Sequence, residues 1–224
     1  MKRLFIFFFL ISAIVPISLA QEEEEDEEFA PKKDHIYFSL ELLKTIPWLM
    51  IDNSYIIEPE LAYRTSGLLI SVQVGINDIK TGIYERLEYR NEGRYLKVGA
   101  GVDFSYFRRR SDDRSNTILG GNLIFASFDE TGKVQLEENY FENPTLIQSN
   151  DARGIEIFFT YRRVSESNVF FSITPRIAYV MSDLDEEYFP TYYVPGFGVV
   201  NPFESSSYGH RITAGFGLKL GYRF

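Results

Sequence analysis

Apolar and polar residues alternate along most of the chain from His35 to the C-terminus. In the final segment, 211–224, every second residue is apolar, and the positions between carry only arginine, threonine, glycine and lysine. A repeat of two residues places successive side chains on opposite faces of a β-strand. Eight segments follow this pattern: 35–43, 55–64, 68–77, 95–106, 117–128, 154–163, 170–181 and 211–224.

The connections between these segments alternate between long and short. The long ones span 44–54, 79–93, 129–153 and 183–209, and the short ones span 64–67, 108–116 and 165–168. Long loops at one end and tight turns at the other are typical of outer-membrane β-barrels with both termini in the periplasm. The sequence therefore predicts an all-β fold, a closed eight-stranded antiparallel up-and-down transmembrane β-barrel over residues 35–224.

Alternation alone does not fix the direction of the apolar face, because a soluble barrel of the lipocalin type encloses its apolar residues. The charges on the polar face favour the opposite arrangement. They nearly cancel, although the whole chain has a net charge of −9, and buried charges persist mainly as pairs. We therefore expect apolar side chains turned toward lipid and a lumen crossed by ion pairs. The expected lumen network comprises Glu41, Glu58, Glu60, Lys97, Asp103, Glu156, Arg162, Arg176, Arg211, Lys219 and Arg223.

The chain ends on an aromatic residue in strand register, and apolar residues alternate back from it. This set comprises Phe216, Leu218, Leu220, Tyr222 and Phe224. The ending resembles the C-terminal signal by which the barrel-assembly machinery recognises outer-membrane proteins. The resemblance implies that this machinery is a partner during biogenesis. It also implies a place in the bacterial outer membrane, surrounded by outer-membrane lipid and lipopolysaccharide.

Residues 1–20 have the features of a secretory signal peptide, with a positive start, an apolar run and a small-residue cleavage site ending at Ala20. An uncleaved anchor is the alternative, although Pro16 interrupts the run, which is shorter than the ~20 residues that span a bilayer. Residues 21–34 form an acidic leader in which 22–28 are all acidic. Because like charges repel, we expect a disordered periplasmic segment, or a contact site for a basic periplasmic partner or an export factor.

Composition narrows the function classes further. Cysteine is absent, which excludes disulfides, thiol chemistry and a lipid anchor on an N-terminal cysteine. An acidic protein provides no field that attracts nucleic acid, so no nucleic-acid partner is expected. Aromatic residues make up 16% of the chain, and this enrichment favours strands over helices.

Two short motifs suggest a relationship. They are Gly93-Arg94-Tyr95-Leu96-Lys97-Val98-Gly99 and Tyr193-Val194-Pro195-Gly196-Phe197-Gly198, which precedes the final strand. They resemble a family of small, uncharacterised outer-membrane β-barrels that is catalogued as a domain of unknown function. The resemblance extends from Tyr37 to the C-terminus. It implies the barrel and its location, and it contributes no catalytic residue.

Some small outer-membrane barrels are lipid-modifying enzymes, whose chemistry needs a nucleophile beside a base. The histidines are His35 and His210, and serines 205–207 lie near the second in sequence. His210 lacks the His-x-Ser element expected of a deacylase. We therefore predict that the protein is not an enzyme, with an outer-membrane lipid hydrolase or acyltransferase as the alternative.

Metal binding and conduction are two further alternatives. The acidic residues at 183 and 185–187 suit a calcium ion, but their spacing matches no EF-hand and a solvated acidic loop explains them. We predict no metal site and no cofactor. The interior of an eight-stranded barrel is just wide enough for side chains to fill, so a narrow channel is an alternative rather than the expectation.

The long outer loops are then the expected functional surface, because binding residues concentrate on loops held by a rigid scaffold. Aromatic residues there suit contact with an extracellular protein or glycan. Alternatively, they pack over the barrel mouth or rest in the membrane interface. The candidates are Tyr140, Phe141, Tyr188, Phe189, Tyr192, Tyr193 and Phe197. The sequence thus predicts a barrel of structural or interaction type that presents loops 129–153 and 183–209.

Overall fold

The structure is a computed structural model that describes residues 34–42, 54–84, 87–107, 114–134, 145–184, 187–188, 191–200 and 212–224. The expected signal peptide, the acidic leader up to residue 33 and the region around His210 lie outside these residues. So do several single candidates, namely Tyr140, Phe141, Asp185, Glu186, Phe189 and Arg211.

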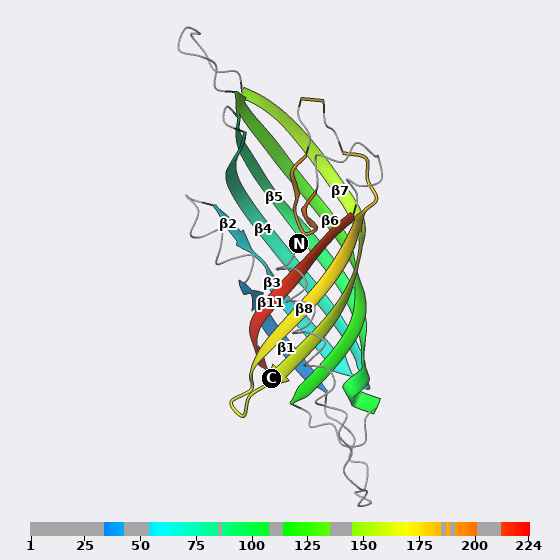
Figure 1. Cartoon of the computed structure of the whole chain (residues 1–224). Helices are drawn as coiled ribbons and strands as arrows, with labels where there is room; N and C mark the ends of the chain where they lie inside the picture. The colour runs from blue at the N-terminus through cyan, green and yellow to red at the C-terminus, as the bar shows by residue number, and fades with distance from the viewer. Residues whose placement is uncertain are drawn as a thin grey trace, which may run out of the picture. The chain divides into compact units, whose positions relative to one another are not determined.

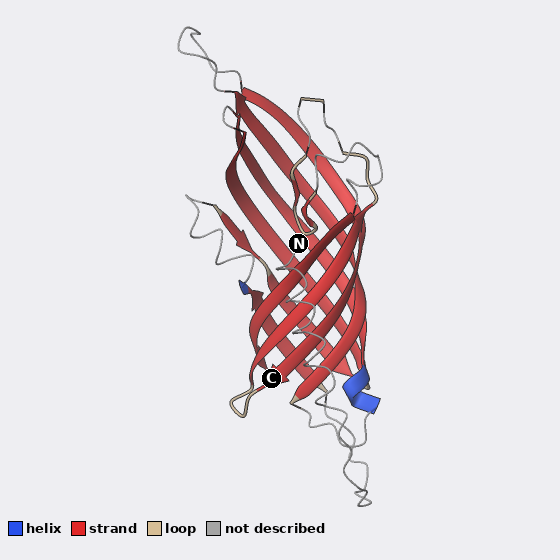
Figure 2. Cartoon of the chain, viewed as in Figure 1, coloured by secondary structure: helices blue, strands red, loops and turns tan. Residues whose placement is uncertain are grey.

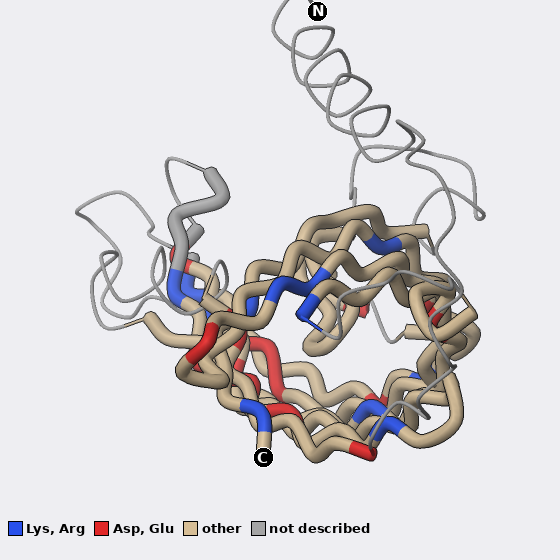
Figure 3. The backbone as a smooth tube through the Cα atoms, turned by 90° about the horizontal axis from the view of Figure 1, so that it is seen from below, with Lys and Arg blue, Asp and Glu red and all other residues tan. Residues whose placement is uncertain are grey.

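The barrel consists of β1 (His35–Glu41), β2 (Tyr55–Ile57), β3 (Pro59–Thr65), β4 (Leu68–Tyr84), β5 (Leu87–Asp103), β6 (Ser115–Val134), β7 (Thr145–Val164), β8 (Val169–Val180) and β11 (Ile212–Arg223). All neighbouring strands are antiparallel, and the pairing of β4 with β5 closes the sheet (Figure 1, Figure 2). β2 and β3 pair with β4 in one continuous register, so they are one barrel strand interrupted at Glu58. The ring therefore has eight strands. Figure 3 views this ring along the barrel.

Two prolines interrupt the ladder of hydrogen bonds, because proline has no backbone N–H to donate. Pro59 follows the break between β2 and β3. Opposite Pro175, the pairing of β7 with β8 stops after Phe158 and Arg176 and resumes at Tyr161 and Ile173. A proline inside a strand predicts either a local bulge or a missing ladder bond, and at Pro175 the register continues unchanged across the gap, so the structure shows the missing bond.

Side chains alternate between the lumen and the outside along the barrel strands. On β7, Ile157 is 62% exposed, whereas the next residue toward the N-terminus, Glu156, is 3% exposed. Apolar residues on the outside and charged residues on the inside are the reverse of a soluble barrel. The predicted closed, eight-stranded transmembrane-type fold is confirmed. In the described part of the chain, no helix has the length and apolar character needed to cross a bilayer.

Strands β4 to β7 are much longer than the strands on the other side of the ring (Figure 1). The prediction that 79–93 and 129–153 are loops is therefore wrong, because most of these residues continue the strands. Above Leu96 and Ile155 the outward side chains become mostly charged or polar, with Ile147 an exposed exception, so the alternation that marks a lipid-facing strand is lost while the ladder continues. We call the part above this change the extended sheet, which comprises 78–84, 87–94, 127–134 and 145–153.

The opposite end of the barrel has the short turns that the sequence predicts. Ser66 and Gly67 connect β3 to β4, and both have positive φ values. Residues 165–168 connect β7 to β8, with Asn168 at a φ of 62°. The final residue lies at this end too, because the Phe224 N–H donates to the carbonyl of Ile36 on β1 at 2.8 Å.

Candidate functional site

A segment of the last long connection, 191–200, enters the mouth of the barrel (Figure 1). It contains a hairpin of β9 (Tyr193–Val194) and β10 (Gly198–Val199). Phe197 is 1% exposed, although it belongs to a connection rather than to a barrel strand. Gly196 and Gly198 have φ values of 81° and 119°, which residues with a Cβ rarely adopt. We call residues 191–200 the lumen hairpin.

Arg176 on β8 holds the tip of the lumen hairpin. Its Nη1 donates to the carbonyl of Gly196 at 2.9 Å, and its Nη2 donates to the carbonyl of Phe197 at 3.2 Å. Thr213 on β11 donates from Oγ1 to the same Phe197 carbonyl at 3.0 Å. Because buried carbonyls need hydrogen-bond partners, these three bonds fix the hairpin to the barrel wall.

The inner face of the extended sheet holds the other side of the lumen hairpin. Asn91 donates from Nδ2 to the carbonyl of Tyr193 at 2.9 Å, and Thr191 donates from Oγ1 to Glu130 Oε2 at 2.8 Å. The buried Glu130 carboxyl accepts further hydrogen bonds from Tyr89, Gln148 and Asn150. Burial raises the pKa of the Glu130 carboxyl above its usual value, although these hydrogen bonds act in the opposite direction.

Small residues in the wall make room for the hairpin side chains. A Cβ on Gly93 of β5 would lie 2.8 Å from Cγ of Pro195. A Cβ on Gly154 of β7 would lie 2.6 Å from Cε1 of Phe197. Both distances are shorter than van der Waals contact, so a Cβ at either position would collide with the hairpin, and it would also collide with Phe128 or the Tyr179 carbonyl of the barrel wall. The glycine on β5 also opens the first of the two motifs singled out in the sequence.

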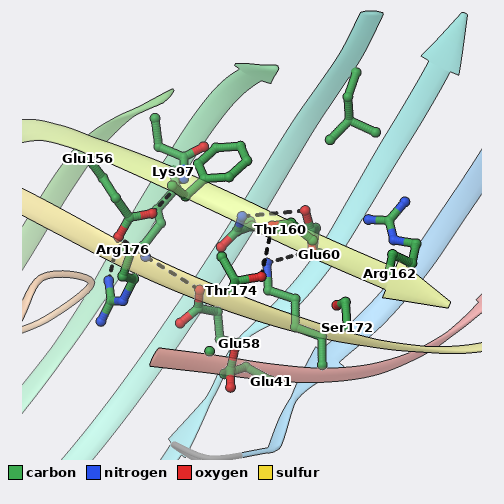
Figure 4. A pocket seen from close by; sticks show the side chains of 16 residues that line it. Glu41, Glu58, Glu60, Lys97, Glu156, Thr160, Arg162, Ser172, Thr174 and Arg176 are labelled. Carbon is green, nitrogen blue, oxygen red and sulfur yellow. Dashed lines mark hydrogen bonds and ion pairs between the residues drawn. The ribbon is translucent and has the colours of Figure 1, made fainter. Parts of the chain in front are cut away.

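Next to the tip of the lumen hairpin, charged side chains meet across the lumen (Figure 4). Lys97 Nζ lies 3.2 Å from Glu156 Oε2 and 3.6 Å from Glu58 Oε1. Arg176 forms an ion pair with the same Glu156 carboxylate. All four side chains are less than a tenth exposed. Glu156 therefore links the lumen charges to the arginine that binds the hairpin.

A second group lies among β1, β3 and β11. Lys219 Nζ is 2.7 Å from Glu60 Oε2, which also accepts a hydrogen bond from Ser39 Oγ at 3.0 Å. Glu41 accepts a hydrogen bond from the backbone N–H of Leu218 at 2.6 Å. These carboxylates and the lysine lie where the sequence predicts them, on the inner face.

The turn end of the lumen contains an ion pair of which only one partner, Asp103, is among the predicted lumen residues. Arg64 Nη1 lies 3.1 Å from Asp103 Oδ2, and both side chains are buried. Asn116 donates to the same oxygen at 2.9 Å, and the Ser105 N–H donates to the other oxygen at 3.0 Å. Arg64 is absent from the predicted lumen residues, because it ends its segment. Its position, an even number of residues from Glu58 and Glu60, is the signal that places it on the same face.

Two predicted network members have other surroundings. The Arg162 guanidinium is buried between two rings, 4.1 Å from the ring centroid of Tyr37 and 4.6 Å from that of Phe170. Among the described residues, no carboxylate lies within 4 Å of it. Arg223 donates from Nη2 to Asn168 Oδ1 at 3.0 Å, at the turn after β7. Aromatic faces therefore take the place of a carboxylate partner at Arg162.

The aromatic candidates divide into three groups. Tyr193 and Phe197 are buried in the lumen hairpin. The interpretation that these side chains pack over the barrel mouth is therefore correct, and the interpretation that they form a contact surface is wrong. Tyr192 is half-buried, with its ring 6.1 Å from that of Tyr89. Tyr188 is 50% exposed. In the proposed assembly signal, all outward side chains but one are exposed, namely Phe216, Leu220, Tyr222 and Phe224, while Leu218 is half-buried.

Little space remains between these groups. A cavity of about 20 Å³ lies in the lumen, lined by both charged groups and by Thr160, Ser172 and Thr174. A cavity of this size holds about one water molecule. The described residues therefore leave room for ordered water and not for a dissolved solute.

A family model described as a domain of unknown function, DUF6048, matches residues 1–222. The chain belongs to the DUF6048 family. The resemblance to an uncharacterised family of outer-membrane barrels, inferred from the two motifs, is thereby confirmed. No curated protein matches this DUF6048 chain.

Solved structures also resemble this DUF6048 protein. A major outer membrane protein from Thermus thermophilus matches with a TM-score of 0.52 and 9% identity, over 85% of this chain and 99% of that chain. Neisserial surface protein A matches with a TM-score of 0.41 and 12% identity, over 85% of this chain and 92% of that chain. The likeness to the Thermus protein shows that the chain has the fold of an outer-membrane barrel.

Proposed function

We propose that this DUF6048 protein is a sealed, non-catalytic barrel of the bacterial outer membrane. In this proposal the barrel is a scaffold, and the extended sheet, together with the long loops, contacts an extracellular protein or glycan. Both chain termini are in the periplasm, and the C-terminal residues are read by the barrel-assembly machinery. The single observation that carries the proposal is the lumen hairpin, which Arg176 fixes above paired charges.

The outer face supports membrane insertion. Between Arg153 and Arg163, the outward residues of β7 are Ile155, Ile157, Phe159 and Tyr161. Ten residues rise about 33 Å along a strand. At a strand tilt of about 40° this becomes about 25 Å along the barrel axis, the height of the apolar band of outer-membrane barrels. We call the outward apolar residues at this height the apolar belt.

The lumen supports a sealed barrel over a narrow channel. Paired charges occupy its middle, the cavity there is about 20 Å³, and the lumen hairpin fills the mouth. An ion would have to displace Arg176 or Lys97 from their carboxylates, which is costly inside a barrel of low dielectric constant. His35 is the first residue of β1 and lies at the turn end of the barrel. This position accords with the proposal of a non-catalytic protein.

The extended sheet supports an interaction role. Its outward face carries exposed side chains of both signs, including Glu88, Glu92, Asp129, Lys80 and Lys133. These side chains stand on strands that are hydrogen-bonded along their length. A surface that is already ordered loses little conformational freedom on binding, so polar contacts made there translate efficiently into affinity.

Cysteine labelling on intact cells tests the orientation. Because the chain has no cysteine, single substitutions can be labelled cleanly. Thr145→Cys lies at the end of the extended sheet, and Ser167→Cys lies in the turn at the other end; both side chains are exposed. We expect a membrane-impermeant maleimide to label Thr145→Cys on intact cells and Ser167→Cys only after lysis. Labelling of Ser167→Cys alone on intact cells would show that the barrel is inverted, and equal labelling would show that it is not inserted.

A further inference from the structure

Two arginines project outward at the height where the apolar belt ends. Arg94 on β5 is the next outward residue above Leu96, and Arg153 on β7 is the next above Ile155. Both side chains are exposed. In a membrane-inserted barrel, this height is the level of the lipid headgroups.

The register places both arginines around one strand, β6. Arg94 pairs with Ser127, and Arg153 pairs with Phe125, which lies two residues before Ser127 on the same outward face of β6. From the strand spacing and rise, the two arginine Cα atoms are about 12 Å apart. Arginine side chains are long enough to converge over β6 from that separation. Ser127 is exposed on β6, the strand between the two that carry the arginines, and its hydroxyl offers a third donor.

Within the described part of the chain, no ion pair engages the guanidinium groups of Arg94 and Arg153. Within the described residues, neither has a carboxylate within 4 Å. By contrast, the exposed Arg90 lies 2.8 Å from Asp78 and the exposed Arg114 lies 3.2 Å from Glu166. In the next outward layer, Asp129 accepts a hydrogen bond from Ser149, and Glu92 is paired with Arg90.

Asp151 pairs with Ser127, so it lies in the same row as Arg94 and Ser127 and belongs to this patch. Two arginines and one aspartate leave this patch with a positive formal charge. Guanidinium groups bind phosphate through two parallel hydrogen bonds and are weakly hydrated, which suits a membrane interface. A single phosphate over β6 would satisfy both arginines and the serine.

We propose that Arg94, Ser127 and Arg153 bind the phosphate of a phosphorylated glycolipid in the outer leaflet. The inference rests on the proposed placement in the outer membrane. A lipid is favoured over a free phosphate because Leu96 and Ile155 lie directly below the arginines, Phe125 lies beside Arg153, and all three are exposed. These apolar side chains would contact the acyl chains of the same lipid molecule.

The test is a binding titration of the full-length mature barrel in detergent micelles by native mass spectrometry, with a diphosphorylated lipid A as the probe. We expect Arg94→Gln or Arg153→Gln to weaken binding about tenfold, and the double variant about a hundredfold. Lys133→Gln is the matched control, because it removes one positive charge from the same outward face of β6, farther from the belt. Its affinity should stay within about twofold of the wild type.

Three outcomes separate the possibilities. A double variant that binds diphosphorylated lipid A like the wild type overturns the proposal. Competition by inorganic phosphate at concentrations similar to the lipid also overturns it, because the site would then be a soluble-anion site. Equal binding of dephosphorylated lipid A would assign the contact to the acyl chains and exclude a phosphate site.

Labelling distinguishes this inference from the function on which it depends. If Thr145→Cys is not labelled on intact cells, the proposed outer-membrane placement is wrong. If it is labelled and the double variant still binds diphosphorylated lipid A normally, the placement stands and the phosphate site alone is wrong. Both arginines are exposed on the outer face, so unchanged circular dichroism of the variants is expected and confirms that they are folded.

Discussion

Arg176→Glu is expected to lower the free energy of unfolding by about 5 kcal/mol. The substitution places a second carboxylate beside Glu156 and removes the two hydrogen bonds that hold the carbonyls of Gly196 and Phe197. Removing one partner of a buried ion pair leaves an uncompensated charge, and here the new charge also repels its neighbour. Urea unfolding in lipid vesicles, followed by circular dichroism, measures the change.

Two variants sharpen this experiment. Glu156→Arg in the Arg176→Glu background should restore only part of the loss, because the new arginine would face Lys97, which is 3.2 Å from Glu156 in the native lumen. Arg114→Glu is the matched control, since Arg114 and its partner Glu166 are both exposed. It should cost less than about 1 kcal/mol. An Arg176→Glu barrel that unfolds at the same urea concentration as the wild type would contradict the ion-paired lumen.

Asp103→Ala is expected to be nearly as damaging, with a loss of about 3–5 kcal/mol in the free energy of unfolding. It leaves the buried Arg64 without its carboxylate and removes the acceptor of Asn116 and Ser105. The same urea titration measures it. If the loss comes from the stranded charge, Arg64→Met in the Asp103→Leu background should recover most of it, because an apolar pair of similar volume needs no partner.

The opposite result has a clear form. If the double apolar variant is as unstable as Asp103→Ala, the free energy of unfolding lost in Asp103→Ala comes from the turn after β5 and not from the buried charge. Asp103 Oδ1 also accepts the Ser105 N–H at the start of the short 3-10 turn Phe104–Phe107, so this outcome would assign the residue to the turn.

The sequence is most informative where one physical requirement acts on every second residue. Lipid on one side and a narrow lumen on the other impose the alternation that predicts the strands, the outward face of β11 and the inward position of Lys219. The same rule places Arg64 in the lumen once it is continued to the end of its segment.

The alternation of apolar and polar residues ends at the membrane surface, so the sequence does not predict how far the strands continue beyond it. Outward residues such as Glu92 and Asp129 face water, so the strands continue without an apolar face to mark them. The lumen hairpin is harder still to predict. Its contacts join Phe197 and Gly196 to Arg176 on a strand some twenty residues earlier and Tyr193 to Asn91 on the far wall, and no local pattern encodes such pairs.

The packing of the hairpin nonetheless explains the two motifs. Pro195 and Phe197 belong to one motif, and Gly93, beside which Pro195 fits, begins the other. The stretches that suggest the family are thus two sides of one contact, between the lumen hairpin and the wall of the extended sheet.

Conductance in a planar lipid bilayer tests the sealed lumen most directly. With the purified mature barrel inserted from dilute detergent, we expect no unitary current steps at any voltage that a larger open porin tolerates in the same membrane. Reproducible steps from the wild-type barrel, scaling in number with the amount of protein inserted, would mean that ions pass the lumen hairpin and the charges beneath it, and that the scaffold is a channel after all.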